Sequence, residues 1–241
     1  GVMFLSSSAA IFNQLLESQS DQTMERTRNR AVASGRVSKK EALFLASLMG
    51  SLGFYLLVSQ TTWLAAVVAL SGHVFYTLVY TLYLKPRTVQ NIVIGGAAGA
   101  VGPLIGWAAA AGELAWPAVL LFLLIFAWTP PHLWALSLKY KKDYARANIP
   151  MYPNVYGDEK TRRAILLYSF SLLPIVLLLG FWQGVSSFFV ILSTVLTLIF
   201  VLKAWGLYSS HTNDTAMPFF HFSCLYIFIY FCGLSLDSLW P

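Results

Sequence analysis

The sequence predicts an all-α integral membrane protein, and three observations lead to that fold class. Of the 241 residues, 57% are hydrophobic and only 11% are charged, against roughly a quarter charged in ordinary soluble domains. Seven apolar stretches are each long enough to cross a hydrocarbon core of about 30 Å. All 16 lysine and arginine residues lie in or beside alternate connections between these stretches. The composition excludes a soluble globular protein, and the cation clustering excludes a nucleic-acid-binding face.

The seven predicted spans follow one another with short connections. They run over residues 42–58, 62–84, 91–111, 116–138, 164–182, 184–206 and 217–240. Residues 1–16 form a shorter apolar segment without the basic start or small-residue cleavage site of a signal peptide. We interpret that segment as the end of a helix in an N-terminally truncated chain, and residues 1–241 as a single membrane domain. Small residues between 95 and 106 predict a close helix-packing face.

The charges give this layout an orientation. Cations occupy residues 26–40, 85–87, 139–163 and position 203, whereas the connections around Gln60, Glu113 and Gly184 carry none. Short loops rich in lysine and arginine face the cytoplasm in most membrane proteins. We therefore expect eight segments in all, with one charged cytoplasmic face that also holds most of the carboxylates.

Three oxygen-bearing side chains recur at helical spacing across the end of the first segment. Asn13, Glu17 and Asp21 are separated by four residues each, which places them along one stripe of a helix. Amide and carboxylate oxygens suit Mg²⁺, which is typically held by one or two carboxylates together with substrate phosphates. A polar helix end with two surface acids would show the same spacing.

Arginines crowd the loop that follows. Arg26, Arg28, Arg30 and Arg36 lie within a short stretch after Asp21. Guanidinium groups beside a magnesium site could bind a diphosphate bidentately. Anchoring at the level of lipid headgroups would also account for them.

A Pro-Pro-His element interrupts the fourth long span. Pro130 and Pro131 remove backbone donors, which lipid tolerates only where protein covers the freed carbonyl groups, so this helix should face the bundle interior. His132 follows them, and an ionisable group inside a span is a candidate functional residue, although a neutral structural imidazole fits equally well. His73 has the same two interpretations. Asp143, among three lysines, could be an ion-pair partner or a further metal ligand.

Taken together, these motifs resemble the protoheme IX farnesyltransferase (heme O synthase) family of the UbiA-type intramembrane prenyltransferases. The resemblance is carried by Asn13, Glu17 and Asp21, by the runs ERTRNR (25–30), YTLYLKPRT (80–88), NIVIGG (91–96) and WTPPH (128–132), and by KDY (142–144) with IPM (149–151). It implies nine helices in two pseudo-repeated halves around a central cavity open to lipid, with the first helix missing here.

The resemblance also implies an activity: transfer of a farnesyl group from farnesyl diphosphate to a vinyl group of heme B, giving heme O. Mg²⁺ would be the cofactor and heme B a substrate. The implied partners are farnesyl diphosphate, heme B, the lipid bilayer and a downstream heme A synthase, with no nucleic acid. A bacterial plasma membrane is favoured over a mitochondrial inner membrane, with the active site at the cytoplasmic or matrix face.

The residues that this activity would use fall into three sets. Asn13, Glu17, Asp21 and Asp143 would act as catalytic Mg²⁺ ligands; Arg26, Arg30, Arg36, Lys85, Arg87 and Lys142 would bind the diphosphate; His132, His73 and Tyr144 would position heme. The family's second aspartate motif is incomplete, because Ala147 stands four residues after Asp143. Two alternatives remain: a sister prenyltransferase acting on a quinone precursor, and a polytopic anion or heme transporter.

Overall fold

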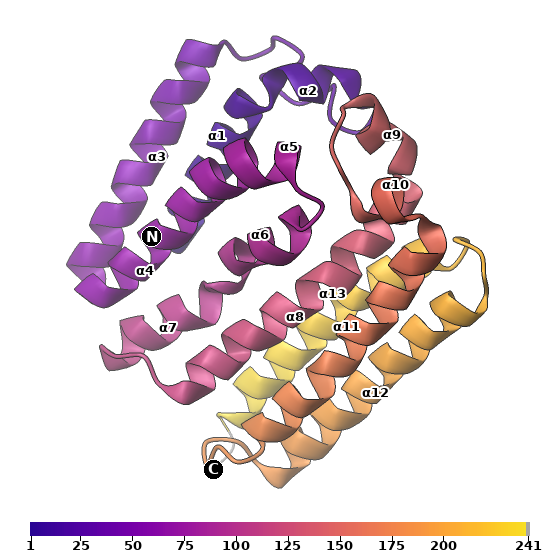
Figure 1. Ribbon diagram of the computed structural model, residues 1–241. Helices are drawn as coiled ribbons and strands as arrows, with labels where there is room; N and C mark the ends of the chain where they lie inside the picture. The colour runs from indigo at the N-terminus through magenta and orange to yellow at the C-terminus, as the bar shows by residue number, and fades with distance from the viewer. Residues whose placement is uncertain (240–241) are drawn as a thin grey trace. The chain divides into compact units, whose positions relative to one another are not determined.

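The structure of the chain is a computed structural model that describes residues 1–239. Every regular element between those residues is a helix (Figure 1). Seven helical segments are long and apolar enough to cross a membrane, and the shorter apolar helix α1 (Val2–Leu16) lies at the start of the described chain. The prediction of an all-α membrane protein with seven spans and one shorter segment is therefore confirmed.

The spans match the predicted order, and two of them are composite. Trp63–Arg87 joins α4 (Trp63–Val74), the π-helix η1 (Phe75–Leu84) and α5 (Lys85–Arg87), while Asn91–Ala111 joins α6 (Asn91–Ala100) and α7 (Gly102–Ala111). The remaining spans are α3 (Lys39–Gln60), α8 (Trp116–Lys139), α11 (Asp158–Leu179), α12 (Ser187–Ser209) and α13 (Ala216–Asp237). Three short helices, α2 (Ser18–Thr23), α9 (Lys141–Arg146) and α10 (Tyr152–Tyr156), lie between spans.

Helix ends account for the differences in span boundaries. α11 begins at Asp158 rather than residue 164, because Gly157 turns the chain with φ +85° and two acidic residues occupy the first turn. Carboxylates at a helix N-terminus are stabilised by the helix dipole, but they lower the hydropathy on which span prediction depends. α3 likewise begins early, at a capping box made by Ser38 and Glu41.

The chain divides into two compact units. The first contains Gly1–Ala118 together with Lys142–Met151, and the second contains Val119–Lys141 together with the residues from Tyr152 onward. The segment 142–151, which holds all of α9 except its first residue, therefore packs with the N-terminal unit although it follows α8 in the sequence.

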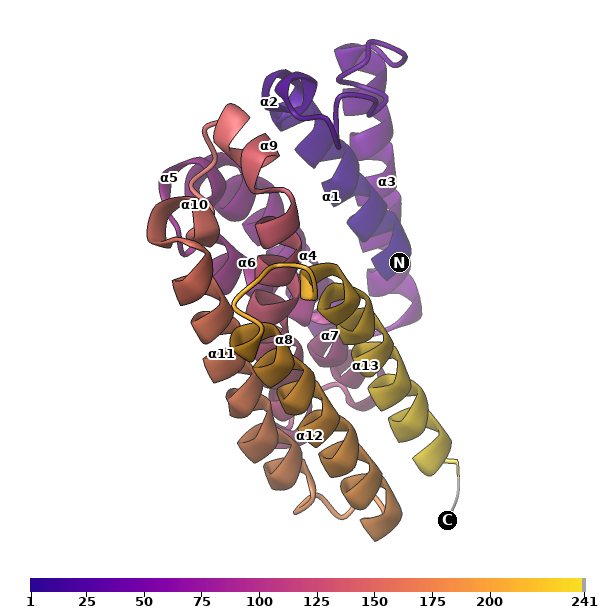
Figure 2. The ribbon, with the colours of Figure 1, turned by 90° about the vertical axis from the view of Figure 1, so that its right-hand side faces the viewer.

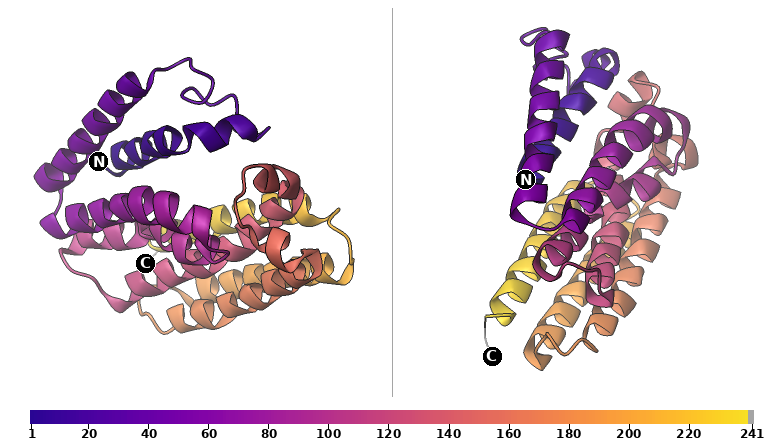
Figure 3. Two further views of the ribbon diagram at one scale, coloured as in Figure 1. Left: turned by 45° about the horizontal axis from the view of Figure 1, so that its top comes forward. Right: turned by 90° about the vertical axis from the view of Figure 1, so that its left-hand side faces the viewer.

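In the first unit, α1 packs along α3, as Figures 1 and 3 show. The Ser8 hydroxyl donates to the Ala46 carbonyl at 2.7 Å. A Cβ atom added to Gly53 would lie 2.8 Å from the backbone nitrogen of Leu5, so the two helices approach at backbone distance, as small residues allow. Buried Ala65 and Ala66 of α4 and Ala108 of α7 belong to one apolar cluster, so small residues also line the contact between these two helices.

In the second unit, α11 packs on α12 and α12 on α13 (Figure 2). The core between the last two holds Phe200 and Tyr226, whose hydroxyl contacts Thr197 at 3.0 Å. α8 runs unbroken through Pro130 and Pro131, both buried. The sequence prediction that this helix turns its proline pair toward protein agrees with that burial.

The close approach of α1 and α3 predicts the effect of one added methyl group. Gly53→Ala should lower the free energy of unfolding by about 1–3 kcal/mol, because its Cβ meets backbone that cannot move aside. Gly99→Ala is the matched control, since nothing lies within 4 Å of its added Cβ. Thermal unfolding in detergent would measure both, and equal midpoints would contradict the packing described.

Candidate active site

Asn13, Glu17 and Asp21 lie on a continuous line of helical hydrogen bonds. α1 ends at Leu16 and α2 begins at Ser18, yet Glu17 N donates to Asn13 O at 2.9 Å and Asp21 N to Glu17 O at 2.8 Å. This i to i−4 pattern keeps the three side chains on one stripe. All three are buried, with Asp21 only 2% exposed.

One guanidinium nitrogen shows that these side chains converge. Arg30 Nη1 lies 2.9 Å from Asp21 Oδ2, 3.4 Å from Asn13 Oδ1 and 3.9 Å from Glu17 Oε2. Oxygens from all three groups therefore lie within 4 Å of one cationic atom. The three side chains with Arg30 and Lys85 are called the carboxylate cluster below.

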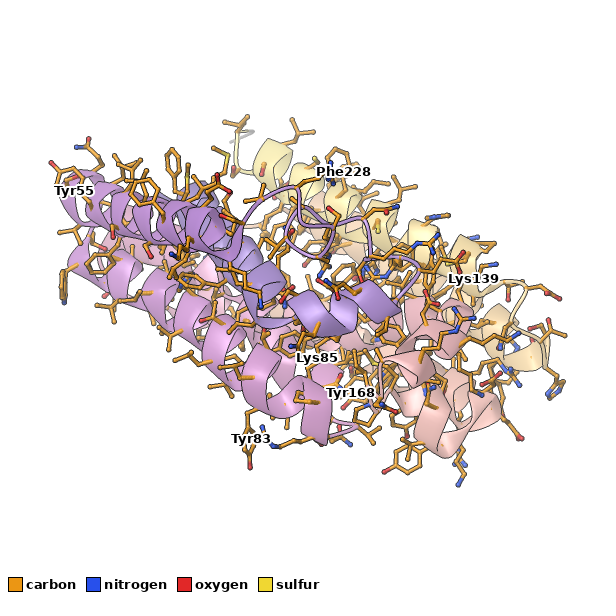
Figure 4. The ribbon with its side chains drawn as sticks, turned by 90° about the horizontal axis from the view of Figure 1, so that it is seen from above. Tyr55, Tyr83, Lys85, Lys139, Tyr168 and Phe228 are labelled. Carbon is orange, nitrogen blue, oxygen red and sulfur yellow. The ribbon has the colours of Figure 1, made fainter. Side chains whose placement is uncertain are left out.

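Lys85 balances the second carboxylate of the cluster. Its Nζ lies 2.6 Å from a carboxylate oxygen of Glu17, and both side chains are largely shielded from solvent. Figure 4 shows Lys85 under α2, whereas the nearby Tyr83 points outward. Two buried negative charges are thus matched by two cations, which burial of charge requires.

The loop after α2 positions Arg30 at the carboxylate cluster. Thr27 Oγ1 donates to Asp21 O at 3.2 Å and Gln22 Nε2 donates to Ala33 O at 3.0 Å. Met24, Val32 and Ala33, which belong to the loop, are buried. Residues 24–37 therefore fold back over α2, so that an arginine nine positions after Asp21 meets its carboxylate.

The segment 142–151 contributes Tyr144 to the neighbourhood of the cluster. Burial raises the pKa of the Tyr144 hydroxyl, and the nearby Arg26, which hydrogen-bonds to it, acts in the opposite direction. Glu17 and Arg30 are also close enough to influence that pKa. Asn91, fully buried, anchors the segment by donating to Pro150 O at 3.3 Å.

The Asp143 carboxylate has its ion-pair partner outside the carboxylate cluster. Its carboxylate pairs with Arg146 on its own helix at 3.4 Å, one of the two interpretations open from the sequence. Among residues 1–239, no three His, Cys, Asp or Glu side chains are close enough to share a metal ion. Asp143 as a metal ligand stays a prediction.

The other predicted cations lie on the exposed surface. Arg36 donates to Asn29 O and Ser34 Oγ within its own loop, and Arg87 donates to Leu82 O and lies over the Tyr83 ring. Lys142 is exposed. Of the six predicted diphosphate ligands, the structure places Arg30 and Lys85 in the carboxylate cluster and Arg26 beside it.

The two candidate histidines have different surroundings. In the first unit, His73 Nδ1 lies 3.2 Å from the Leu5 carbonyl, so it carries the proton, and the ring packs edge-on against Phe12. This contact holds α4 to α1. In the second unit, His132 lies between the rings of Trp128 and Phe220, at centroid distances of 4.3 and 4.4 Å.

A serine fixes the tautomer of His132. Ser223 Oγ donates its proton to the Phe220 carbonyl at 2.6 Å, so it can only accept from His132 Nδ1, also at 2.6 Å. The neutral ring then keeps its lone pair on Nε2, the arrangement found in metal-binding histidines. No motif or spacing indicates Ser223, which lies 91 positions after His132 in the sequence.

The amino-acid sequence matches the family described as the UbiA prenyltransferase family over residues 1–231. The chain belongs to the UbiA prenyltransferase family. Its relatives include proteins named protoheme IX farnesyltransferase from Picosynechococcus sp., 45% identical over 99% of this chain and 76% of the relative, and from Aromatoleum aromaticum, 42% identical over 100% and 79%.

Solved structures of UbiA proteins share the fold. A digeranylgeranylglyceryl phosphate synthase structure aligns with a TM-score of 0.78 at 18% identity, covering 98% of this chain and 82% of the other. A UbiA homolog from Archaeoglobus fulgidus, bound to GPP and Mg²⁺, aligns with a TM-score of 0.67 at 15% identity, covering 96% and 84%. These likenesses confirm the all-α membrane fold that the sequence predicts.

The donor set of the carboxylate cluster fits Mg²⁺. It offers one amide oxygen and two carboxylates, all hard ligands, and they converge on one point that a cationic nitrogen already contacts. Mg²⁺ in phosphate-handling sites takes one or two protein carboxylates and completes its shell with water and phosphate oxygens. The cluster therefore has the chemistry for a magnesium diphosphate.

The Glu17–Lys85 pair predicts a compensating double variant. Lys85→Met leaves a carboxylate buried without its partner and should lower the free energy of unfolding by about 3 kcal/mol. Glu17→Gln combined with Lys85→Met removes the charge and should recover most of that loss. Unfolding in detergent would measure both, and an additive loss in the double variant would contradict the pairing.

Proposed function

We propose that this chain transfers the farnesyl group of farnesyl diphosphate to a vinyl group of heme B, producing heme O. Relatives named for this reaction are 42–45% identical over nearly the whole chain. The observation that carries the proposal is that oxygens of Asn13, Glu17 and Asp21 all lie within 4 Å of one nitrogen atom, Nη1 of Arg30. Such a site suits a diphosphate bound together with Mg²⁺. A prenyl diphosphate is the donor that the UbiA family uses.

The bond changes define what the site must do. The carbon–oxygen bond at C1 of the farnesyl group breaks, and its electron pair leaves with the diphosphate. The vinyl group of heme B supplies the electrons for the new carbon–carbon bond, and the resulting cation takes a hydroxyl from water, which releases a proton. The step that needs the protein is the first, because charge develops on the leaving group.

The carboxylate cluster supplies that stabilisation. Asn13, Glu17 and Asp21 would hold Mg²⁺, which neutralises diphosphate charge and acts as a Lewis acid when bound. Arg30 contacts the three oxygen-bearing groups and Lys85 pairs with Glu17 beside them, so both can bind phosphate oxygens there. A tyrosine hydroxyl is protonated at neutral pH, and burial raises the pKa of Tyr144 further, so its hydroxyl can donate to a further phosphate oxygen. We assign Tyr144 to the diphosphate rather than to heme.

Heme positioning is assigned to His132 rather than His73. The Nε2 lone pair of His132 is left free by Ser223, and its ring is held between two aromatic rings. A neutral imidazole in this state is a suitable axial ligand for heme iron. His73 uses its proton on the Leu5 carbonyl between two helices, a packing role.

The charge distribution supports a location. Along the sequence, the cations occupy alternate connections between the spans, and the carboxylate cluster lies at two of these connections. The positive-inside rule assigns such connections to the cytoplasm. We place the reaction at the cytoplasmic face of a bacterial plasma membrane, where water-soluble diphosphate is released. The product would pass to a heme A synthase in the same membrane.

The first test is the reaction itself. Membranes containing the protein, given heme B, farnesyl diphosphate and Mg²⁺, should yield a heme bearing a hydroxyethylfarnesyl group, detected by chromatography and mass spectrometry. Asp21→Asn should reduce turnover at least about 100-fold, a loss typical when a charge-stabilising group is removed. Glu25→Gln, at an exposed acid four residues on, should retain it. Prenylation of a quinone precursor with unchanged heme B would overturn the assignment.

The heme contact has its own spectroscopic test. Titration of ferric heme B into the purified protein should give a Soret band typical of histidine ligation. His132→Ala should lose that band and regain it on addition of imidazole, while His221→Ala, a neighbouring histidine that is exposed, should behave as the unchanged protein. An unaltered spectrum in His132→Ala would exclude iron ligation by this residue.

A further inference from the structure

Thr81 lies inside a membrane span, at a position where the π-helix η1 passes the carboxylate cluster. Its side chain is 5% exposed, and its Oγ1 is 3.3 Å from Asn13 Nδ2. Thr81 belongs to the run YTLYLKPRT (80–88), but neither its charge nor its spacing within that run assigns it a role. Its significance comes entirely from what its hydroxyl contacts.

The hydroxyl proton of Thr81 is already used. Thr81 Oγ1 donates to the Tyr76 carbonyl at 2.8 Å, five residues earlier. In an α-helix a threonine hydroxyl reaches the carbonyl three or four residues earlier, whereas the i to i−5 pattern of a π-helix brings a more distant carbonyl within reach. The same register appears in the backbone, where Lys85 N donates to Tyr80 O.

Because the hydroxyl of Thr81 donates its only proton to the Tyr76 carbonyl, it can only accept a hydrogen bond from Asn13. Asn13 must therefore present its NH₂ group to Thr81, and its carbonyl oxygen must point the other way. That oxygen lies 3.4 Å from Arg30 Nη1, on the side of Asp21 and Glu17. With the amide reversed, two N–H donors would face the point where a cation is to bind.

We propose that Thr81 is a positioning residue that fixes the Asn13 amide so that its oxygen, not its nitrogen, faces the metal. This inference rests on the proposed function, since it concerns the magnesium site. Partners that orient metal ligands typically change metal affinity by about 10–100-fold when removed. The π-helix is then a functional feature, because it aims the Thr81 proton away from Asn13.

The chain contains a matched control one turn earlier. Thr77 lies in the same π-helix and is also 5% exposed, but its hydroxyl donates only to the backbone carbonyls of His73 and Val74. Thr77→Val and Thr81→Val make the same chemical change at equal burial in one helix. Only the second removes an acceptor from Asn13.

Binding of Mn²⁺ in the presence of inorganic pyrophosphate tests the proposal without turnover. Free Mn²⁺ would be measured by electron paramagnetic resonance with protein in detergent. Thr81→Val should weaken Mn²⁺ binding about 10-fold or more, whereas Thr81→Ser and Thr77→Val should stay within about twofold of the unchanged protein. Equal affinities in Thr81→Val and Thr77→Val would overturn the proposal.

A change at Asn13 separates orientation from packing. In the Asn13→Asp background the side chain has two equivalent oxygens and no wrong orientation, so Thr81→Val should cost much less affinity there. A full loss in that background would indicate a structural effect and contradict the proposal. Asp21→Asn tests the magnesium site itself. If this variant binds Mn²⁺ as the unchanged protein does, the proposed magnesium site is wrong. If Asp21→Asn abolishes Mn²⁺ binding while Thr81→Val does not weaken it, only the proposed role of Thr81 is wrong.

Discussion

Two buried carboxylates, Glu17 and Asp21, must be neutralised, and the first unit is organised around how this happens. Their partners Lys85 and Arg30 come from opposite directions along the chain, one from a span 68 residues later and one from the loop directly after α2. A carboxylate without its cation at this depth would cost several kcal/mol. The pairing therefore fixes α1, the folded loop and the end of η1 relative to one another.

The same pairing gives the site its chemistry. Cations that neutralise carboxylates in the protein are the groups that can neutralise a diphosphate, and carboxylates that attract cations are the groups that can hold Mg²⁺. A magnesium diphosphate brings both charges at once, so it can exchange partners with both sets without leaving a buried charge unpaired. We propose that this balance makes the site select a magnesium diphosphate over a simple anion.

Much of this arrangement could be predicted from the sequence. The spans follow from hydropathy, and the stripe of Asn13, Glu17 and Asp21 follows from spacing alone, because four residues make about one helical turn. Arg30 and Lys85 are among the six cations that the sequence predicts as diphosphate ligands. The sequence could not rank them above Arg36 or Arg87, because the rank depends on how a loop folds back and where a helix ends.

The features that were not predictable are hydrogen bonds between distant elements. Thr81 and Ser223 are ordinary polar residues in apolar runs. The hydroxyl of each donates a hydrogen bond to a nearby backbone carbonyl, so it can only accept one from its other partner. The π-helical register of η1 leaves no mark in composition, since π and α segments use the same residues. The sequence places Asp143 among three lysines, but its closest cation in the structure is Arg146 on the same helix, a partner that depends on how this short helix is exposed.

The most direct measurement is an experimental structure with Mn²⁺ and a farnesyl diphosphate analogue that cannot ionise, with manganese located by anomalous scattering. The account predicts manganese coordinated by Asn13 Oδ1 and by a carboxylate oxygen of Asp21, with phosphate oxygens hydrogen-bonded to Arg30 and Lys85. Manganese and diphosphate bound elsewhere, with the Glu17–Lys85 and Asp21–Arg30 pairs unchanged, would contradict it.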